Sequence, residues 1–113
     1  TKQKTEDYYQ QMNELFDKYP EMDAMFSEDL IIMNALKCAS ERGRHIPDEF
    51  KAVGYDGTLI AKISYPSMTY VSQPIKELAD TLVDVLLKKI NGAKLYEDII
   101  LEDVCLVKGQ TTE

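Results

Sequence analysis

The sequence predicts an α/β fold, a layered parallel sheet with flanking helices. Short apolar and β-branched segments alternate along the chain with helical segments of ten or more residues. Connections of that length suit right-handed crossovers between parallel strands. The chain has 113 residues, of which 44% are hydrophobic, and this is enough to fill one modest core. We find no internal repeat and no low-complexity segment.

The chain should begin with a helix followed by a short strand. From residue 6 to residue 18, apolar side chains recur at spacings of three and four, which places them on one helical face. Tyr19-Pro20 ends this pattern, because proline disfavours a helical residue before it. Residues 22–26 then predict a short buried strand.

A second helix is expected over Leu30 to Arg42, with Ser27 or Asp29 capping its first turn. Gly43 is its natural C-terminal stop. Phe50 to Tyr55 predicts the next strand, which runs into a turn at Asp56-Gly57.

Residues 58–68 show little periodicity and predict an irregular crossing segment, followed by a short strand at Thr69 to Val71. Ile75 to Ile90 carries the apolar stripe of a third helix, and Asn91-Gly92 stops it. This stripe should belong to a core. The extended stretches 99–101 and 104–107 come last, before a tail that we expect to fray from residue 109.

Charge and cysteine content narrow the class of protein. A formal net charge of -7 predicts repulsion from nucleic acid and from anionic lipid. Cys38 and Cys105 lie in apolar stretches without metal-site spacing, which predicts two buried thiols in a reducing, cytoplasmic compartment. No apolar run approaches the length of a membrane span. Residues 1–5 contain neither an initiator methionine nor a signal peptide core, which predicts a piece of something longer.

Several motifs resemble the LacI/GalR family of transcriptional regulators, whose effector core is similar to class I periplasmic sugar-binding proteins. The most specific is residues 41–56, ERGRHIPDEFKAVGYD, which is close to the family's ERGxxIPxDxxVVGYD. Residues 23–36 resemble its strand, polar turn and interface helix. Residues 65–74 are similar to its proline loop and TTVxQP crossover. Residues 106–112 resemble its closing LVxRxST run, although Gly109 stands where an arginine is common.

The resemblance implies the C-terminal part of an effector-binding domain. Residues 1–68 would belong to the C-terminal lobe, 69–98 to the crossover and a helix of the N-terminal lobe, and 99–113 to a returning strand and tail. DNA would be read by an N-terminal helix-turn-helix outside this chain. Without the rest of the N-terminal lobe, the helix 75–90 would dock on its own sheet, pair with a second chain, or be disordered.

Three carboxylates are candidate ligand-binding residues. Asp56 follows a parallel strand, and ligands of open α/β sheets bind at that edge. Its Asp-Gly context alone favours a turn residue, whereas the resemblance implies contact with a sugar or sugar phosphate. Glu28 stands where the family often has an asparagine, and its carboxylate can only accept hydrogen bonds. Asp29 is equally consistent with helix capping.

The helix over Leu30 to Ala39 is apolar nearly all round, which indicates a second buried face. From the residues alone, this face could lie inside the domain or between two chains. The resemblance implies a homodimer interface, which also includes the loop from Leu59 to Tyr65. The residues expected there are Leu30, Ile31, Met33, Asn34, Lys37, Ile63 and Tyr65.

We expect no catalytic residue, metal site or cofactor. A glycosidase would need two carboxylates at a fixed separation, and capping plus a turn explains Glu28, Asp29 and Asp56 without chemistry. His45, the only histidine, lacks a partner motif and should be an exposed turn residue. The alternatives to a repressor fragment are a stand-alone α/β binding or interaction module and, less favoured, a small hydrolase.

Overall fold

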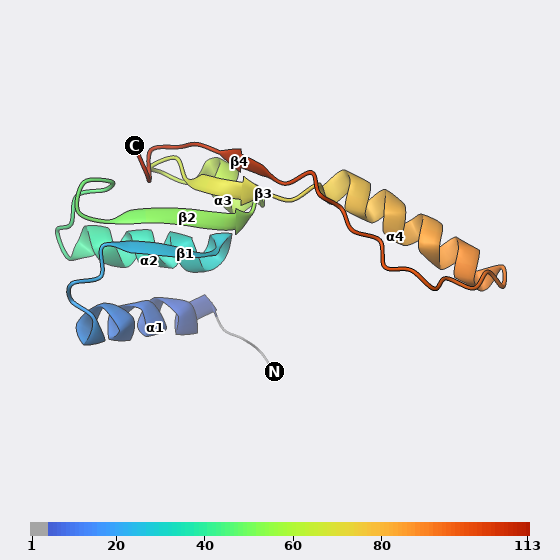
Figure 1. Ribbon diagram of the computed structural model, residues 1–113. Coiled ribbons are helices and arrows are strands. Elements are labelled where there is room, and N and C mark those ends of the chain that lie inside the picture. The colour runs from blue at the N-terminus through green and yellow to red at the C-terminus, as the bar shows by residue number, and fades with distance from the viewer. Residues whose placement is uncertain (1–4) are drawn as a thin grey trace. The chain divides into compact units, whose positions relative to one another are not determined.

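The computed structural model describes residues 5–113, so residues 1–4 of the expected fragment start lie outside it. The chain forms two compact units, Thr1–Ser72 with Cys105–Glu113, and Gln73–Val104. The lobe boundaries expected from the resemblance stay a prediction. In chain order the elements are α1 (Thr5–Lys18), β1 (Ala24–Glu28), α2 (Asp29–Glu41), β2 (Lys51–Asp56), α3 (Leu59–Ile63), β3 (Thr69–Ser72), α4 (Ile75–Ile90) and β4 (Cys105–Val107) (Figure 1).

The first unit is built on a four-stranded sheet in the order β1-β2-β3-β4. As predicted, β1, β2 and β3 are parallel, and α2 and α3 are their crossovers. The last strand differs from the expected parallel sheet, because β4 pairs antiparallel with β3. The register explains why: the chain leaves β3 at Ser72 and returns at Cys105, directly opposite, so it can only run back along the strand.

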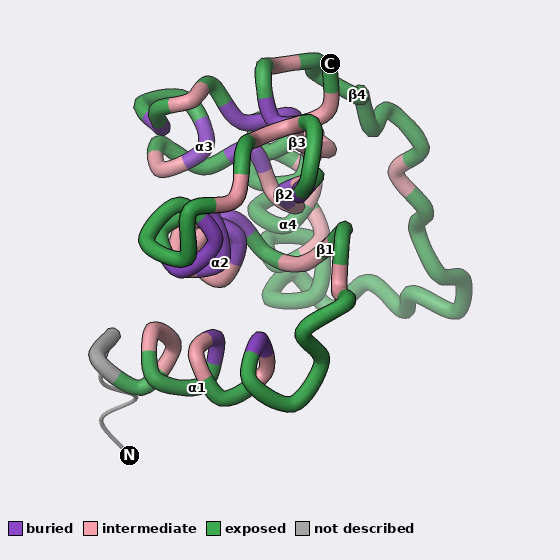
Figure 2. Tube along the Cα trace, turned by 90° about the vertical axis from the view of Figure 1, so that its left-hand side faces the viewer, coloured by how far each residue is buried: buried purple, intermediate pink, exposed green. Residues whose placement is uncertain are grey.

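The core lies between α2 and the sheet, and α1 packs against α2 (Figure 2). The rings of Phe16 on α1 and Phe50 before β2 are both buried, with centroids 5.2 Å apart. Cys38 is buried on α2, as predicted. The buried apolar residues are Met12, Phe16, Ile32, Ala35, Leu36, Cys38, Ala39, Phe50, Ala52, Ala61 and Met68.

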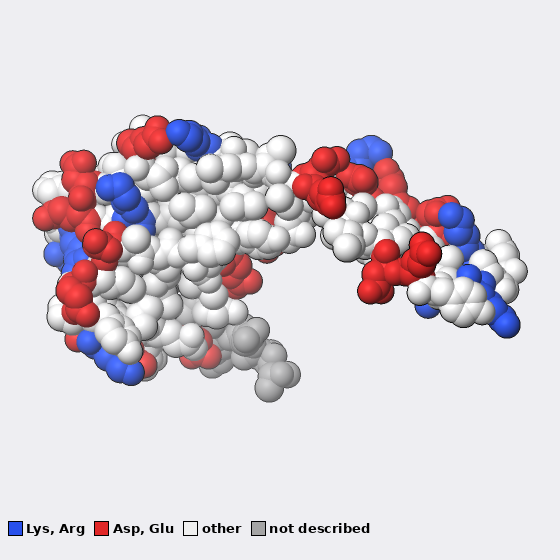
Figure 3. Space-filling model, viewed as in Figure 1, with Lys and Arg blue, Asp and Glu red and all other residues white. Residues whose placement is uncertain are grey.

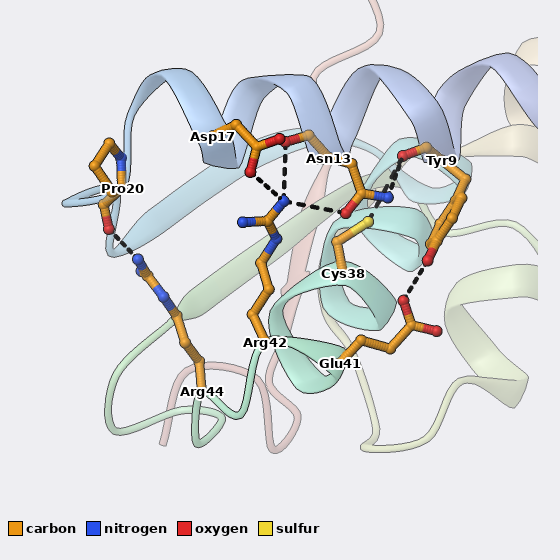
Figure 4. A network of polar contacts seen from close by, with 8 residues as sticks. All are labelled: Tyr9, Asn13, Asp17, Pro20, Cys38, Glu41, Arg42 and Arg44. Atoms are coloured by element: carbon orange, nitrogen blue, oxygen red, sulfur yellow. Dashed lines mark hydrogen bonds and ion pairs between the residues drawn. The ribbon is translucent and has the colours of Figure 1, made fainter.

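Polar bonds join α1 to the end of α2 (Figure 4). The guanidinium of Arg42 donates to Asp17 at 2.7 Å and to the carbonyl oxygen of Asn13 at 3.1 Å. Arg44 donates to the carbonyl oxygens of Pro20 and Met22, which ties down the connection between α1 and β1.

The first strand is not the buried strand predicted for residues 22–26. It is an edge strand over Ala24–Glu28 with alternating exposure, and Phe26 is 63% exposed. Phe26 makes an edge-to-face contact with Tyr55 on the neighbouring strand at 6.0 Å. The sheet face turned toward the viewer is mainly uncharged (Figure 3). The apolar residues 22–26 therefore predicted a strand correctly, but they did not show that one face of this strand is left uncovered by the described helices.

The ends of α2 confirm one prediction and correct another. Gly43 has φ of 76°, the left-handed conformation expected just beyond a helix C-terminus. The predicted cap at Ser27 or Asp29 is wrong, because Glu28 occupies the N-cap position and makes no side-chain capping bond. Asp29 is the first helical residue, and its carboxylate binds another segment, described below.

Three features between residues 58 and 113 differ from expectation. The segment 58–68 contains the helix α3, too short for its periodicity to show in the sequence. Cys105 is exposed rather than buried, because it lies on the short outer strand β4. The tail does not fray: Thr111 is fully buried, and the amide of Gln110 donates to the carbonyl oxygen of Ser67 at 2.7 Å.

The second unit contains α4, which has the predicted bounds. Asn91 is its C-cap, and Gly92 follows with φ of 87°. Its apolar stripe was expected to be core, but none of its residues is buried. Within this unit, Leu78, Leu82 and Val85 of the stripe line a groove of about 720 Å³ together with residues of the segment 94–101. Where the stripe docks beyond this unit stays a prediction.

The expected strand at residues 99–101 is absent, because this stretch runs beside α4 without a strand partner in the described chain. No helix within residues 5–113 is long and apolar enough to cross a membrane.

Candidate functional site

Three neighbouring parallel strands end at one edge of the sheet and bring polar residues there. Glu28, the last residue of β1, pairs with Tyr55 on β2. Asp56, the last residue of β2, pairs with Ser72 at the end of β3. Ligands of open α/β sheets bind at this carboxyl edge. The structure thus assembles two of the three predicted ligand residues, Glu28 and Asp56, beside a serine that sequence reasoning did not single out.

Asp56 begins a tight turn of unusual backbone geometry. Its φ is 115°, and that of Gly57 is 73°. Such a conformation costs a non-glycine residue about 1–3 kcal/mol and persists only where the surroundings hold it. A Cβ atom at Gly57 would lie 2.9 Å from Ser72 Oγ and 3.1 Å from Ser72 Cα, so the turn lies close against β3. The predicted Asp56-Gly57 turn is confirmed.

Asp29 lies beneath this turn. Its side chain is 2% exposed, and Oδ2 accepts hydrogen bonds from both the amide and the hydroxyl of Thr58, each at 2.7 Å. The other carboxylate oxygen, Oδ1, is buried without a hydrogen-bond partner in the described chain. Sequence reasoning missed Thr58, because nothing local indicates a partner on a segment so distant in the chain.

Glu28 is different from Asp29 although the two are adjacent. It is exposed and makes no capping bond. Asp56 is half-buried. The edge therefore presents two carboxylates, while the third supports the turn from inside.

The residues predicted for a dimer interface fall partly on one surface. Leu30, Ile31, Met33 and Asn34 are half-buried on α2, and Lys37 is exposed. Ile63 and Tyr65 after α2 are 69% and 90% exposed. A surface hollow of about 440 Å³ brings most of them together, namely Leu30, Met33, Asn34, Lys37 and Tyr65. Ile31 and Ile63 do not line it.

No group of three or more His, Cys, Asp or Glu side chains in the described part of the chain is arranged to hold a metal ion. His45 is exposed, as predicted, in the turn before Phe50. Its amide donates to Glu49 Oε2 at 2.8 Å.

This arrangement of parallel strands and crossover helices occurs in a known family. Residues 1–112 match the periplasmic binding protein-like domain. The chain belongs to this family. The match confirms the family resemblance read from residues 41–56 and the α/β architecture.

Curated relatives of this periplasmic binding protein-like domain are transcriptional regulators. The sucrose operon repressor of Streptococcus mutans is 42% identical over 90 residues, which are 79% of this chain and 28% of that protein. The ribose operon repressor of Halalkalibacterium halodurans is 36% identical over 82 residues, 72% of this chain and 25% of the relative. The chain thus spans about a quarter of the length of these relatives.

The solved structures that resemble this chain include transcriptional regulators as well. A complex of the transcriptional regulator CelR with cellobiose superposes with a TM-score of 0.85 at 27% identity, covering 96% of this chain and 34% of that one. The Lac repressor bound to ONPG gives a TM-score of 0.83 at 28% identity, with 96% and 33% covered. This chain therefore corresponds to the C-terminal, effector-binding part of LacI-type regulators.

Proposed function

We propose that this chain supplies one half of the effector site of a cytoplasmic, sugar-responsive transcriptional repressor and takes no part in catalysis. The observation that carries the proposal is the placement of Glu28 and Asp56 at the ends of neighbouring parallel strands. The names of the relatives support it, since they include sucrose and ribose operon repressors. A regulator of this kind would bind DNA through another part of the protein.

The two carboxylates suit a polyhydroxylated ligand. Each oxygen accepts hydrogen bonds and donates none, so Glu28 and Asp56 would bind hydroxyl groups as acceptors. A carboxylate can accept from two adjacent hydroxyls, and such charge-assisted bonds discriminate between epimers. The fixed backbone of the Asp56 turn would hold this acceptor in place before the ligand arrives.

Charge favours an uncharged sugar over a sugar phosphate. Glu28 and Asp56 share the edge, and Asp29 lies directly beneath. These negatively charged carboxylates would repel a phosphate group, and the repulsion grows as water is excluded from the site.

Effector binding would act through a homodimer, with the hollow beside α2 as part of its interface. A ligand that binds one arrangement of the lobes better shifts the population of the dimer toward that arrangement. In this proposal the chain contributes ligand acceptors and dimer contacts, and the change in DNA affinity follows from both.

The test is titration of this chain with sucrose, cellobiose, ribose and glucose 6-phosphate, followed by NMR chemical shifts of the backbone amides. We expect at least one uncharged sugar to shift the amides of Glu28 and Asp56 at the edge. Asp56→Asn should reduce that response, because it replaces an acceptor by a donor-acceptor amide.

The matched control is Asp23→Asn, which directly precedes β1 at the end of the strand opposite Glu28 and should leave the response unchanged. A titration in which glucose 6-phosphate shifts the edge amides and no neutral sugar does would contradict the preference for an uncharged ligand. Equal responses in the Asp56→Asn and Asp23→Asn variants would contradict the ligand contact at Asp56.

A further inference from the structure

Asp29 is the only charged side chain buried in the described part of the chain. Burial of a carboxylate is unfavourable unless hydrogen bonds compensate. Both compensating bonds come from one residue, Thr58, through its amide and its hydroxyl at 2.7 Å. The bonds are charge-assisted and therefore stronger than those between neutral groups.

Thr58 immediately follows the strained part of the turn. Asp56, with φ of 115°, and Gly57, with φ of 73°, come directly before it. Fixing the amide of Thr58 fixes the end of this three-residue turn, while the pairing of Asp56 with Ser72 fixes its beginning. A residue forced into this region relaxes when one end of its turn is released.

The interior is shaped to admit the Asp29 carboxylate below the turn. A Cβ atom at Gly54 would lie 2.5 Å from Asp29 Oδ1 and 2.6 Å from the sulfur of Met68. Only glycine leaves room for the carboxylate at this point of β2. Oδ1 has no hydrogen-bond partner there in the described chain, and burying an oxygen without a partner is unfavourable for folding.

We propose that Asp29 is a positioning residue: by binding Thr58 from inside, it holds Asp56 in the conformation in which its carboxylate faces an effector. Asp29 then acts through Asp56 and does not touch the effector. This inference rests on the proposed function for its purpose, but the positioning itself exists without a ligand and can be measured without one.

The experiment is NMR on the ligand-free chain, comparing the wild type with Asp29→Asn. Two quantities are measured: the hydrogen-exchange rate of the amide at position 58, relative to that of Val53 on β2, and the three-bond HN–Hα coupling of Asp56, which reports φ. We expect exchange at position 58 to become about tenfold faster, since a charge-assisted bond is weakened. The coupling of Asp56 should move toward that of a residue with negative φ.

A second pair of variants covers the case in which Asp29→Asn does not fold. Thr58→Val removes the hydroxyl bond and Thr58→Ser retains it, at a position whose side chain is exposed. Thr58→Val should change the Asp56 coupling, and Thr58→Ser should restore the wild-type value. A merely structural role would alter Val53 exchange and the global stability without moving Asp56.

Wild-type coupling of Asp56 in folded Asp29→Asn would overturn the inference, as would equal couplings in Thr58→Val and Thr58→Ser. Neither result would bear on sugar binding, which the titration of Asp56→Asn tests separately. Conversely, a chain that binds no sugar but shows the expected couplings would retain the positioning role and lose the proposed function.

Discussion

Thr111 Oγ1 donates a hydrogen bond of 2.6 Å to the carbonyl oxygen of Ala52 on β2. The same hydroxyl accepts from the amide of Thr69 on β3 at 2.8 Å, and the amide of Ala52 donates to the carbonyl oxygen of Thr111 at 3.0 Å. Direct pairing of β2 with β3 begins one residue later, at Val53 and Thr69. The tail therefore bridges the two strands just before their own ladder starts.

Replacing Thr111 with valine should destabilise the first unit. The substitution keeps the shape of the side chain but leaves the buried carbonyl of Ala52 and the amide of Thr69 without their partner, a loss of about 1–3 kcal/mol for a buried group. Urea denaturation measures the free energy of unfolding. Thr81→Val, at a half-buried site on α4, is the control, and an equal effect at both sites would contradict the bridging role.

Gly109 should not tolerate any side chain. A Cβ atom there would lie 2.4 Å from the carbonyl oxygen of Ser67 and 2.6 Å from that of Met68, and backbone atoms cannot move aside without disturbing β3. We expect Gly109→Ala to cost about 1–3 kcal/mol, as overpacking of a close contact does, and Gly109→Arg at least as much. Lys108→Ala, an exposed neighbour, serves as the control in the same denaturation measurement.

A stable Gly109→Arg variant would contradict this account.

The tail shows what sequence reasoning could not reach. Residues 109–113 begin with a glycine and are otherwise polar, which is typical of a frayed chain end. Their placement, and the burial of Thr111, depend on hydrogen bonds to residues 67–69 and Ala52, far away in the chain, and no local pattern indicates these bonds. In contrast α4 was predicted to the residue, because its stripe and its Asn-Gly stop are local signals.

In the candidate site, too, local sequence signals predicted one residue's position, whereas a tertiary contact set that of another. The strand and the Asp-Gly turn placed Asp56 at the carboxyl edge, since strand direction follows from the crossover helices. For Asp29 the sequence left ligand contact and helix capping open, because capping is the local role of aspartate at a helix start. Its bond to Thr58 is a tertiary contact, which takes the place of the capping bond.

The chain should lose stability at alkaline pH. Burial raises the pKa of the Cys38 thiol above its usual 9.0, and a hydrogen bond to Glu41 raises that of the Tyr9 hydroxyl above 10.0. In both cases the folded state holds the proton more tightly than the unfolded state. Their contribution to stability is complete below the unfolded pKa and is lost as pH rises through the folded one.

Denaturant midpoints measured from pH 7 upward should therefore fall beginning near pH 9. Tyr9→Phe should flatten the part of the fall that begins near pH 10. An unchanged alkaline slope in this variant would show that the bond to Glu41 does not hold the Tyr9 proton in solution.

Gly54 should be as intolerant as Gly109, for a different reason. A Cβ atom added at Gly54 would lie 2.5 Å from Asp29 Oδ1 and 2.6 Å from the Met68 sulfur. Gly54→Ala should therefore cost about 1–3 kcal/mol. The matched control is Gly43→Ala, which has open space around it but φ of 76°, and should cost about 1 kcal/mol from backbone conformation alone. Equal costs in denaturation would mean that no steric conflict exists at Gly54.

The proposed dimer surface gives the last prediction. Tyr65 is 90% exposed on the hollow beside α2, and a tyrosine so placed supplies apolar contact area to a partner. Tyr65→Asp would place a charge in the middle of that contact. We expect at least tenfold weaker self-association in analytical ultracentrifugation, because burying an unpaired carboxylate costs more than 1.4 kcal/mol.

Tyr96→Asp is the matched control for Tyr65→Asp, since Tyr96 is 85% exposed but lies in the second unit. It should leave the dissociation constant unchanged if the interface lies on α2. A weaker dimer with Tyr96→Asp and an unaffected one with Tyr65→Asp would instead assign self-association to the apolar stripe of α4, whose residues are all unburied within the chain.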